Sequence, residues 1–163
     1  MVVYSESLIS KFIVDHDGAE PSSNSVAAEN LIRLAAILEN EAYNDVADKL
    51  FHYFKDTLTN HPGSVPMLSS AYLLREREIR LIVMTGKKHS SEFNALQDVY
   101  RGKFVPNRAV QYLKRDGYLA KKSSIALNLP TIGDEKACAH ICQNNTCGPP
   151  FSNPEDLKLS LFT

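Results

Sequence analysis

The acidic loop at residues 15–25 holds the side chains whose types and spacing could do chemistry. Asp17 and Glu20 place two carboxyl groups three residues apart in this loop. Two carboxyl groups can act as general acid and general base when their surroundings separate their pKa values. One interpretation therefore makes Asp17 and Glu20 a catalytic pair acting on a sugar-like small molecule. The ligand contacts would come from the neighbouring polar side chains His16, Ser22, Asn24 and Ser25.

A structural role explains the same loop without any ligand. The loop runs directly into a segment whose apolar residues recur at helical spacing. Asn24 or Ser25 would then cap the helix by accepting from a free backbone N–H, and Asp17 and Glu20 would complement its positive end. Both interpretations stay open at the level of the sequence.

The three cysteines form a second cluster of reactive side chains. On a strand, Cys138, His140 and Cys142 would point to one side, and Cys147 could return to complete a set of zinc ligands. Buried free thiols and a disulfide between Cys142 and Cys147 are the other two possibilities, the disulfide requiring an oxidising compartment. Of these possibilities we do not adopt the zinc site, so we predict no metal and no cofactor.

The elements that must position these side chains are helical in the first half of the chain. Leu31, Leu34, Ala35 and Leu38 predict a half-buried helix. A second helix is predicted over residues 42–58 and a third over 65–74, separated by the stop signal at residues 61–63. Two amphipathic helices joined by a short turn form a helical hairpin.

The second half of the chain changes to a mixed pattern. Residues 79–84 are β-branched and apolar on both faces, which predicts a strand covered on both sides. Residues 91–101 predict a helix, and further strands are expected at 109–113 and 137–142, before a last helix over 155–161. We therefore expect a mainly α fold with a small antiparallel β portion.

Composition limits the class of partner. The 163 residues carry 18 Lys and Arg against 19 Asp and Glu, for a net charge of −1. Nucleic acid is therefore not an expected partner, because phosphate neutralisation requires a basic face. No apolar stretch approaches the roughly 20 residues that span a bilayer, so no membrane is expected either. The cysteine pattern is not a secreted disulfide framework, which favours a cytoplasmic location.

The loop and the tail together resemble the C-terminal part of the spermatogenesis-associated protein 20 family. The resemblance implies an N-terminal thioredoxin-like domain joined to a toroid of α-helical hairpins similar to six-hairpin glycosidases. It covers nearly the whole chain from about residue 15. The segments that carry it are 17–28 with 30–35, 79–86, 104–110, 142–150 and 154–157.

The resemblance implies an architecture more than a reaction. The chain would supply the last hairpins of the (α/α) toroid as a fragment, with residues 1–75 a helical-hairpin segment and 76–163 an α+β segment of the same domain. Its function would be carbohydrate-related binding or metabolism, or alternatively a non-catalytic scaffold for the thioredoxin-like domain, which this sequence lacks. We expect no catalysis from the isolated chain, because an incomplete toroid cannot close its cleft.

Overall fold

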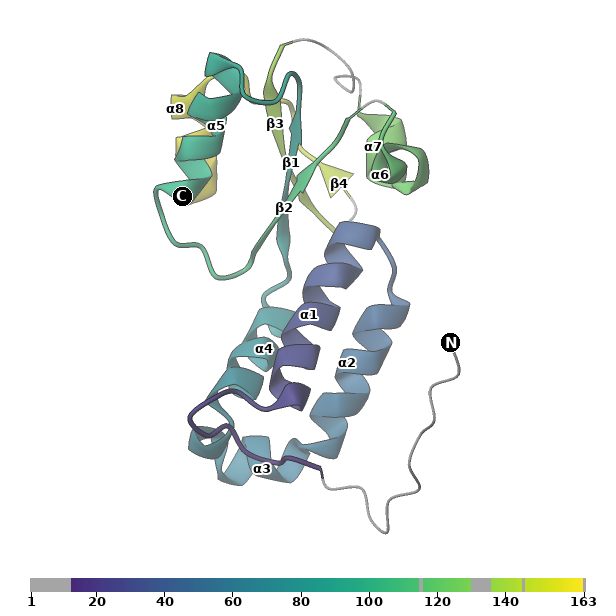
Figure 1. The fold of residues 1–163 in the computed structure, drawn as a ribbon, viewed down its shortest axis with the longest axis vertical. Coiled ribbons are helices and arrows are strands. Elements are labelled where there is room, and N and C mark those ends of the chain that lie inside the picture. The colour runs from purple at the N-terminus through teal and green to yellow at the C-terminus, as the bar shows by residue number, and fades with distance from the viewer. Residues whose placement is uncertain (1–12, 115, 130–135, 145, 163) are drawn as a thin grey trace, which may run out of the picture.

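The computed structural model describes residues 13–114, 116–129, 136–144 and 146–162. A helical half and a sheet-containing half are stacked end to end along the longest axis of the molecule (Figure 1). The helical half contains α1 (Ser23–Leu38), α2 (Ala42–Tyr53), α3 (Lys55–Asn60), the 3₁₀ turn η1 (Pro62–Ser64) and α4 (Pro66–Glu76). The other half contains β1 (Arg80–Thr85), α5 (Ser91–Arg101), β2 (Arg108–Tyr112), α6 (Tyr118–Lys122), α7 (Ser124–Asn128), β3 (Cys138–Gln143), β4 (Thr146–Cys147) and α8 (Pro154–Phe162).

Helix α1 packs between α2 and α4 and presents small residues to them. Ser25, Ala28 and Ala35 are buried there together with Ile32. Small side chains let neighbouring helices approach closely. The face with Ala28 is therefore buried, although it is less apolar than the face with Leu34 that the pattern predicts. The prediction that Leu34 and Leu38 lie on the buried face is wrong, since each is 38% exposed.

The predicted second helix is divided in two. It breaks at Phe54, which ends α2, begins α3 and is itself buried. The apolar periodicity alone would continue the helix to Leu58. The chain turns at Phe54 instead, because the Phe54 ring is buried in the core. The predicted stop at residues 61–63 coincides with η1.

The sheet is mixed, so the prediction of an antiparallel β portion is wrong in part. The strand order is β2-β1-β3-β4, with β1 parallel to β2 and antiparallel to β3. Helix α5 connects β1 to β2, and such a crossover returns the chain in the same direction and makes the pair parallel. Strand β3 pairs with β4 in an antiparallel hairpin.

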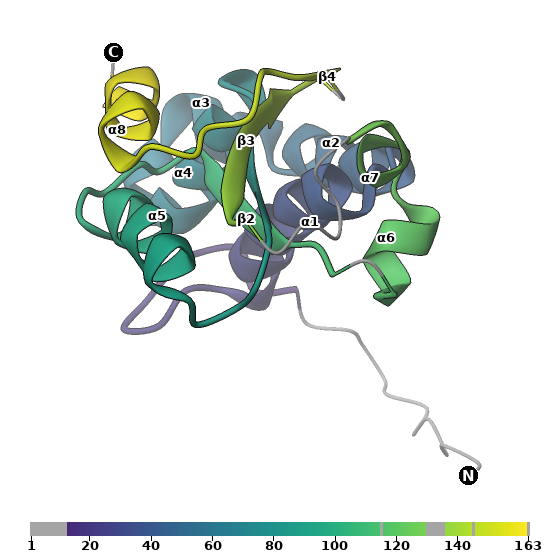
Figure 2. The same cartoon turned by 90° about the horizontal axis from the view of Figure 1, so that it is seen from above.

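Both faces of β1 are covered, as the apolar pattern predicts. Ile82 and Met84 pack under α5 and α8, while Leu81 and Val83 belong to the core shared with the helical half. Figure 2 shows α5 and α8 together on one side of the sheet and α6 and α7 on the other. The central strand is therefore the meeting point of two apolar clusters.

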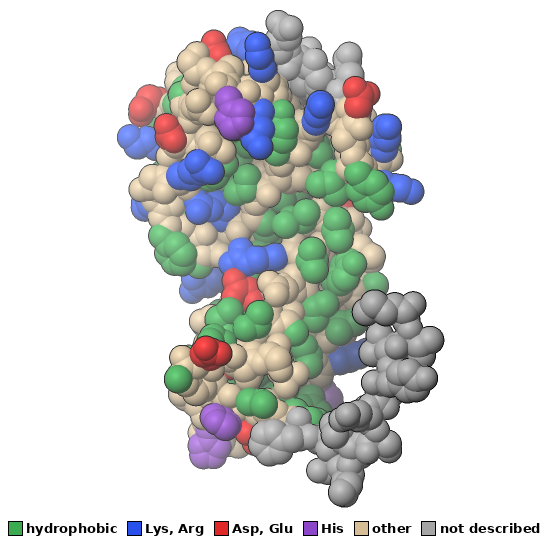
Figure 3. Space-filling model, in the orientation of Figure 1, with side chains coloured by type: hydrophobic (Ala, Val, Ile, Leu, Met, Phe, Trp, Pro, Cys, Tyr) green, Lys and Arg blue, Asp and Glu red, His purple; other side chains and the backbone are tan. Residues whose placement is uncertain are grey.

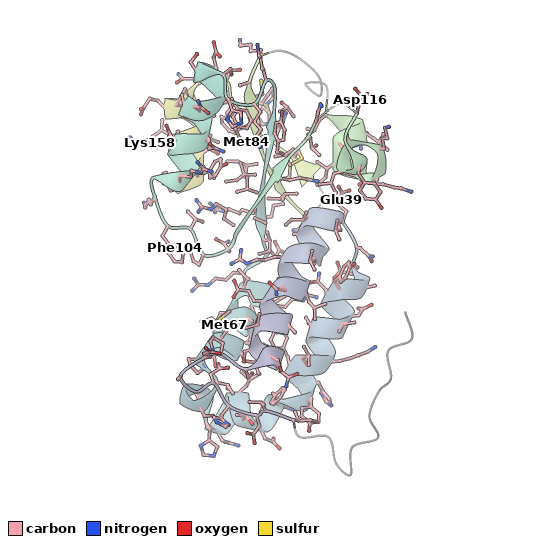
Figure 4. The ribbon with its side chains drawn as sticks, in the orientation of Figure 1. Glu39, Met67, Met84, Phe104, Asp116 and Lys158 are labelled. Carbon is pink, nitrogen blue, oxygen red and sulfur yellow. A yellow bond between two sulfur atoms is a disulfide. The ribbon has the colours of Figure 1, made fainter. Side chains whose placement is uncertain are left out.

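Polar contacts also join the two halves. The Arg33 guanidinium of α1 donates from Nη1 to the Arg108 carbonyl at 2.6 Å. At the C-terminal end of α1, the Glu39 carboxylate accepts from the backbone N–H groups of Ser124 and Ile125, which begin α7. Figure 4 shows Glu39 where α1 meets the sheet-containing half. Among the described helices, none has the length and apolar character that crossing a membrane requires.

The predicted boundary between residues 75 and 76 lies at the last turn of α4. Division of the chain into two segments there stays a prediction, because one apolar cluster contains residues from both sides of it. Membership of a closed toroid likewise stays a prediction.

Candidate functional site

The structure places Asp17 as a hydrogen-bond acceptor that ties the loop to two helices. Its Oδ1 accepts from the Ser22 backbone N–H at 2.8 Å and from the Ser25 hydroxyl at 2.7 Å. Its Oδ2 accepts from the Met67 backbone N–H at 2.8 Å, which lies in the first turn of α4. Figure 4 shows Met67 in the helical half, away from the sheet. The carboxylate thus serves as a cap shared by α1 and α4.

These contacts change the acidity of the side chain. Partial burial raises the pKa of Asp17, but hydrogen bonds from the Ser22 backbone, the Ser25 hydroxyl and the first turn of α4 outweigh it. The pKa of Asp17 therefore lies below its ordinary value. An ionised, fully engaged carboxylate suits an acceptor better than a general acid, which needs a raised pKa.

The other loop residues serve local structure. Ser22 is the N-cap of α1, where Asn24 or Ser25 was predicted, because its side chain accepts from the Ser25 N–H at 3.1 Å. The Asn24 amide donates to the Val14 carbonyl. His16 is exposed with Nδ1 3.1 Å from Asp15, and Glu20 is exposed. A catalytic role for Asp17 and Glu20, and ligand contacts by the others, stay predictions.

A cavity near the C-terminal end of α1 resembles a ligand-binding site more than the Asp17 loop does. It has a volume of about 390 Å³ and lies where α1, α2 and α4 meet the sheet. Ser25 and Ala36 are separated by about 16 Å along a helix, so the predicted loop and this cavity are far apart. Its apolar wall is formed by Ile32, Ala35, Ala36, Ile79, Leu81 and Ile125, and its polar wall by Glu41, Asn44, Arg75, Glu78, Gln143 and Asn144.

The charged lining of the cavity is acidic in balance. Among the described residues that line it, Glu41 and Glu78 oppose one cation, Arg75, whose Nη2 lies 3.6 Å from the Glu41 carboxylate. Arg75 is already held by Asp48, with Nε and Nη2 at 3.1 and 3.2 Å from the two carboxylate oxygens. Hydrogen bonding to Asp48 raises the pKa of Arg75, although partial burial opposes this. The polar wall therefore offers acceptors more readily than donors.

Asn44 adds an acceptor without a partner. Its amide Nδ2 donates to the Glu41 carboxylate at 2.9 Å, which assigns the other amide atom as oxygen because a carboxylate only accepts. This Oδ1 is buried and has no hydrogen-bond partner among the described residues. A buried acceptor without a donor costs about 1–3 kcal/mol. Because this oxygen is closed off from solvent, a ligand O–H or N–H can reach it only if the Asn44 side chain moves.

The β3–β4 hairpin closes one side of the cavity. Glu78, which has a positive φ of 57°, accepts at Oε2 from the side-chain amides of Gln143 and Asn144, at 3.0 and 3.1 Å. Cys142 and Cys147 are directly opposite each other in the hairpin and form a disulfide. Of the three possibilities for the cysteine cluster, the structure therefore has the disulfide, with Cys138 a buried free thiol.

The four-ligand zinc set is overturned by that disulfide, since two of its thiolates are joined to each other. The described residues contain no group of three or more His, Cys, Asp or Glu side chains arranged to hold a metal ion. His140 is 1% exposed with Nδ1 3.3 Å from the Gly148 carbonyl. Burial lowers the pKa of His140, and the Gly148 contact only partly opposes this.

Comparison with known proteins bears out the resemblance carried by the loop and the tail. The chain is similar to spermatogenesis-associated protein 20. It is 27% identical to the human protein over 146 residues and equally similar to the mouse protein. It is also 26% identical over 148 residues to an uncharacterized protein of Caenorhabditis elegans. No family model matches the chain, and no solved structure matches it.

The match covers most of this chain but only a small part of the relative. It includes 88% of this chain but 18% of human spermatogenesis-associated protein 20. The chain thus spans about a fifth of the length of the curated relatives that it matches. The likeness to spermatogenesis-associated protein 20 supports a common ancestry for this region, and the name states no reaction.

Sequence reasoning missed the cavity residues. Asn44 lies on a different helix from Arg75, and Arg75 and Glu78, three residues apart, form no motif with it. The run at residues 75–78 reads as a solvated charge cluster, whereas in the structure Arg75 contacts Asp48 and Glu78 contacts the hairpin. The available signal was Gln143 and Asn144 beside Cys142, within a segment that already carried the family resemblance.

Proposed function

We propose that the cavity between the helical half and the sheet binds a small ligand rich in hydrogen-bond donors, such as a sugar or an amine-bearing sugar. The observation that carries the proposal is the convergence of Glu41 and Glu78 on one cavity whose described lining has one cation, Arg75, already paired with Asp48 and Glu41. Ligand sites combine an apolar wall with a few convergent polar groups. Here the apolar wall would contact a ring face, and the acceptors would receive its hydroxyl or ammonium groups.

The family likeness supports a wider context for this binding. We infer that α1, α2 and α4 belong to a helical-hairpin toroid in a longer protein and that a thioredoxin-like domain is its partner there. In that context the function would be carbohydrate-related binding or metabolism. The isolated chain is expected to bind without catalysing a reaction, since the cavity and the Asp17 loop lie at opposite ends of α1.

Titration calorimetry with D-glucosamine, D-glucose and D-glucuronate tests the proposed binding. The acidic balance of the cavity predicts that protonated glucosamine binds best and that anionic glucuronate does not bind. Glu78→Gln should weaken glucosamine binding about tenfold, because it removes a charged acceptor worth about 1.5 kcal/mol.

Glu76→Gln is the matched control for that variant. Glu76 is exposed on α4 next to Arg75 but does not line the cavity. The same charge change there should leave affinity within about twofold, since an exposed charge outside the cavity contributes little. Equal losses for both variants, or tighter binding of glucuronate, would contradict the proposed site. Amide shift changes confined to residues 16–25 would instead favour the Asp17 loop.

A scaffold role is the second candidate, and one surface favours it. Hydrophobic side chains run over α1 and α2 on the face seen in Figure 3. A contiguous exposed apolar surface is typical of an interface. If the chain is a scaffold, charge changes on this surface should raise its solubility, while the cavity should bind none of the three sugars. The exposed residues on these two helices are Val26, Leu34, Leu38, Val46 and Tyr53.

A further inference from the structure

We infer that the Cys142–Cys147 disulfide is a redox control on the cavity, so that its reduction loosens the cavity wall and weakens ligand binding. The inference rests on the proposed binding function for its ligand-affinity component. Its structural component, the link between the disulfide and the wall, rests on contacts in the β3–β4 hairpin alone.

Among the described residues, few contacts other than the disulfide hold the end of the hairpin that lies next to Glu78. Strand β4 contains two residues, and its pairing with β3 consists of Cys142 opposite Cys147 and Gln143 opposite Thr146. Beyond the disulfide, the Gly148 N–H donates to the Ile141 carbonyl at 3.0 Å, and Ala139 and Phe151 exchange two backbone bonds at 2.9 and 2.8 Å, farther from Glu78. At the end next to Glu78 the pairing is limited to these two residue pairs, so the covalent link contributes a large share of the stability there.

The residues held by this hairpin are those that contact Glu78. Gln143 and Asn144 directly follow Cys142, and both donate to the same Glu78 oxygen. Asn144 has a positive φ of 50°, which Asn tolerates better than most residues but which still needs the turn to hold it. Release of the turn would therefore free both amides from Glu78 and open the polar wall of the cavity.

The two sulfur atoms differ in access. Cys142 is 1% exposed and lines the cavity, whereas Cys147 is partly exposed. A thiolate of an external dithiol can thus attack Cys147 Sγ, which breaks the S–S bond and releases Cys142 as a thiolate that takes up a proton. The second thiol of the dithiol then displaces Cys147 from the mixed disulfide. The protein gains two electrons and two protons, and the dithiol becomes a disulfide.

The test compares the oxidised chain with the chain reduced by dithiothreitol, with the thiol count verified by alkylation and mass measurement. Hydrogen exchange should accelerate at residues 141–148 and also at 76–82, across the Glu78 contacts. Reduction should weaken D-glucosamine binding about tenfold. By reciprocity, saturating glucosamine should lower the reduction potential of the disulfide by about 30 mV. Reoxidation should restore both properties.

Two variants separate the disulfide from general effects of reductant. Cys138→Ala removes the buried free thiol and keeps the disulfide, so it should respond to dithiothreitol as the wild type does. The double variant Cys142→Ala with Cys147→Ala should have the fast exchange of the reduced chain and no response to dithiothreitol. If the double variant does not fold, the reversible wild-type cycle still decides the question.

The outcomes distinguish this inference from the proposed function. Unchanged exchange at residues 76–82 on reduction overturns the redox control, whatever binds. Accelerated exchange at these residues, with no sugar bound by the oxidised chain, overturns the proposed function and supports the link between disulfide and wall. Accelerated exchange with equal glucosamine affinity in both redox states overturns control of binding.

Discussion

Gly86→Ala is expected to lower the free energy of unfolding by more than about 3 kcal/mol, because steric overlap and backbone strain act together. Gly86 follows β1 with φ at 103°, a conformation that residues with a Cβ rarely adopt. An added Cβ would lie 2.6 Å from the Ala137 Cα and 2.8 Å from the Lys136 carbonyl oxygen. Both neighbours are backbone atoms, so relief requires β1 and the segment before β3 to move apart.

Urea unfolding followed by circular dichroism measures this effect as a shift of the midpoint. Gly63→Ala is the matched control, because nothing lies within 4 Å of a Cβ at that position. Its midpoint should stay the same or rise slightly, since alanine restricts the unfolded chain. Equal midpoints for the two variants would show that the close approach of Gly86 to Ala137 is absent from the folded protein.

Asp17→Asn is expected to lower the free energy of unfolding at pH 7 by about 2 kcal/mol, the upper range for loss of a helix cap. The carboxylate receives the Ser22 N–H, the Ser25 hydroxyl and the Met67 N–H, and a neutral amide cannot accept at both of its heavy atoms. Glu20→Gln removes the same charge from an exposed side chain nearby and should change stability by less than about 0.5 kcal/mol.

The pH dependence of this difference follows from the direction of the pKa shift. The pKa of Asp17 is lower in the folded chain than its ordinary value. Its contribution is therefore fully present above the unfolded pKa, about 3.9, and is lost as pH falls through the lower folded value. Unfolding curves at pH 7 and at successively lower pH should show wild type and Asp17→Asn converging in acid. A constant difference down to the lowest pH would mean that the charge of Asp17 is not what stabilises the fold.

Apolar periodicity predicted the elements that are long enough to show a repeat and whose buried faces are apolar throughout. The strand at residues 79–84 was recognisable because both of its faces are apolar, and β1 is indeed covered by two clusters. Helix α5 was recognisable because Phe93, Leu96 and Tyr100 keep helical spacing and all three are buried. The short elements α6, α7 and β4 carry too few residues for a period to be detected, and none of them was predicted.

Strand direction and helix orientation required the tertiary structure. The pairing of β1 with β2 depends on the path of the crossover through α5, which apolar patterns in the two strands do not specify. Helix α1 has more than one apolar face, and the close approach of α2 and α4 buried the face with Ala28 instead of the face with Leu34. The packing of α2 and α4 against α1 therefore decided which face of α1 is buried.

The same distinction between local pattern and tertiary packing applies to the candidate site. The helical first half, the doubly covered central strand and the motifs of the family resemblance were readable without coordinates, because each depends on residues close together in the chain. Only the tertiary structure brought Asn44, Glu78 and the β3–β4 hairpin around one cavity and made Asp17 a shared cap. Each of these contacts joins segments far apart in sequence, and their proximity follows from packing, which no local pattern encodes.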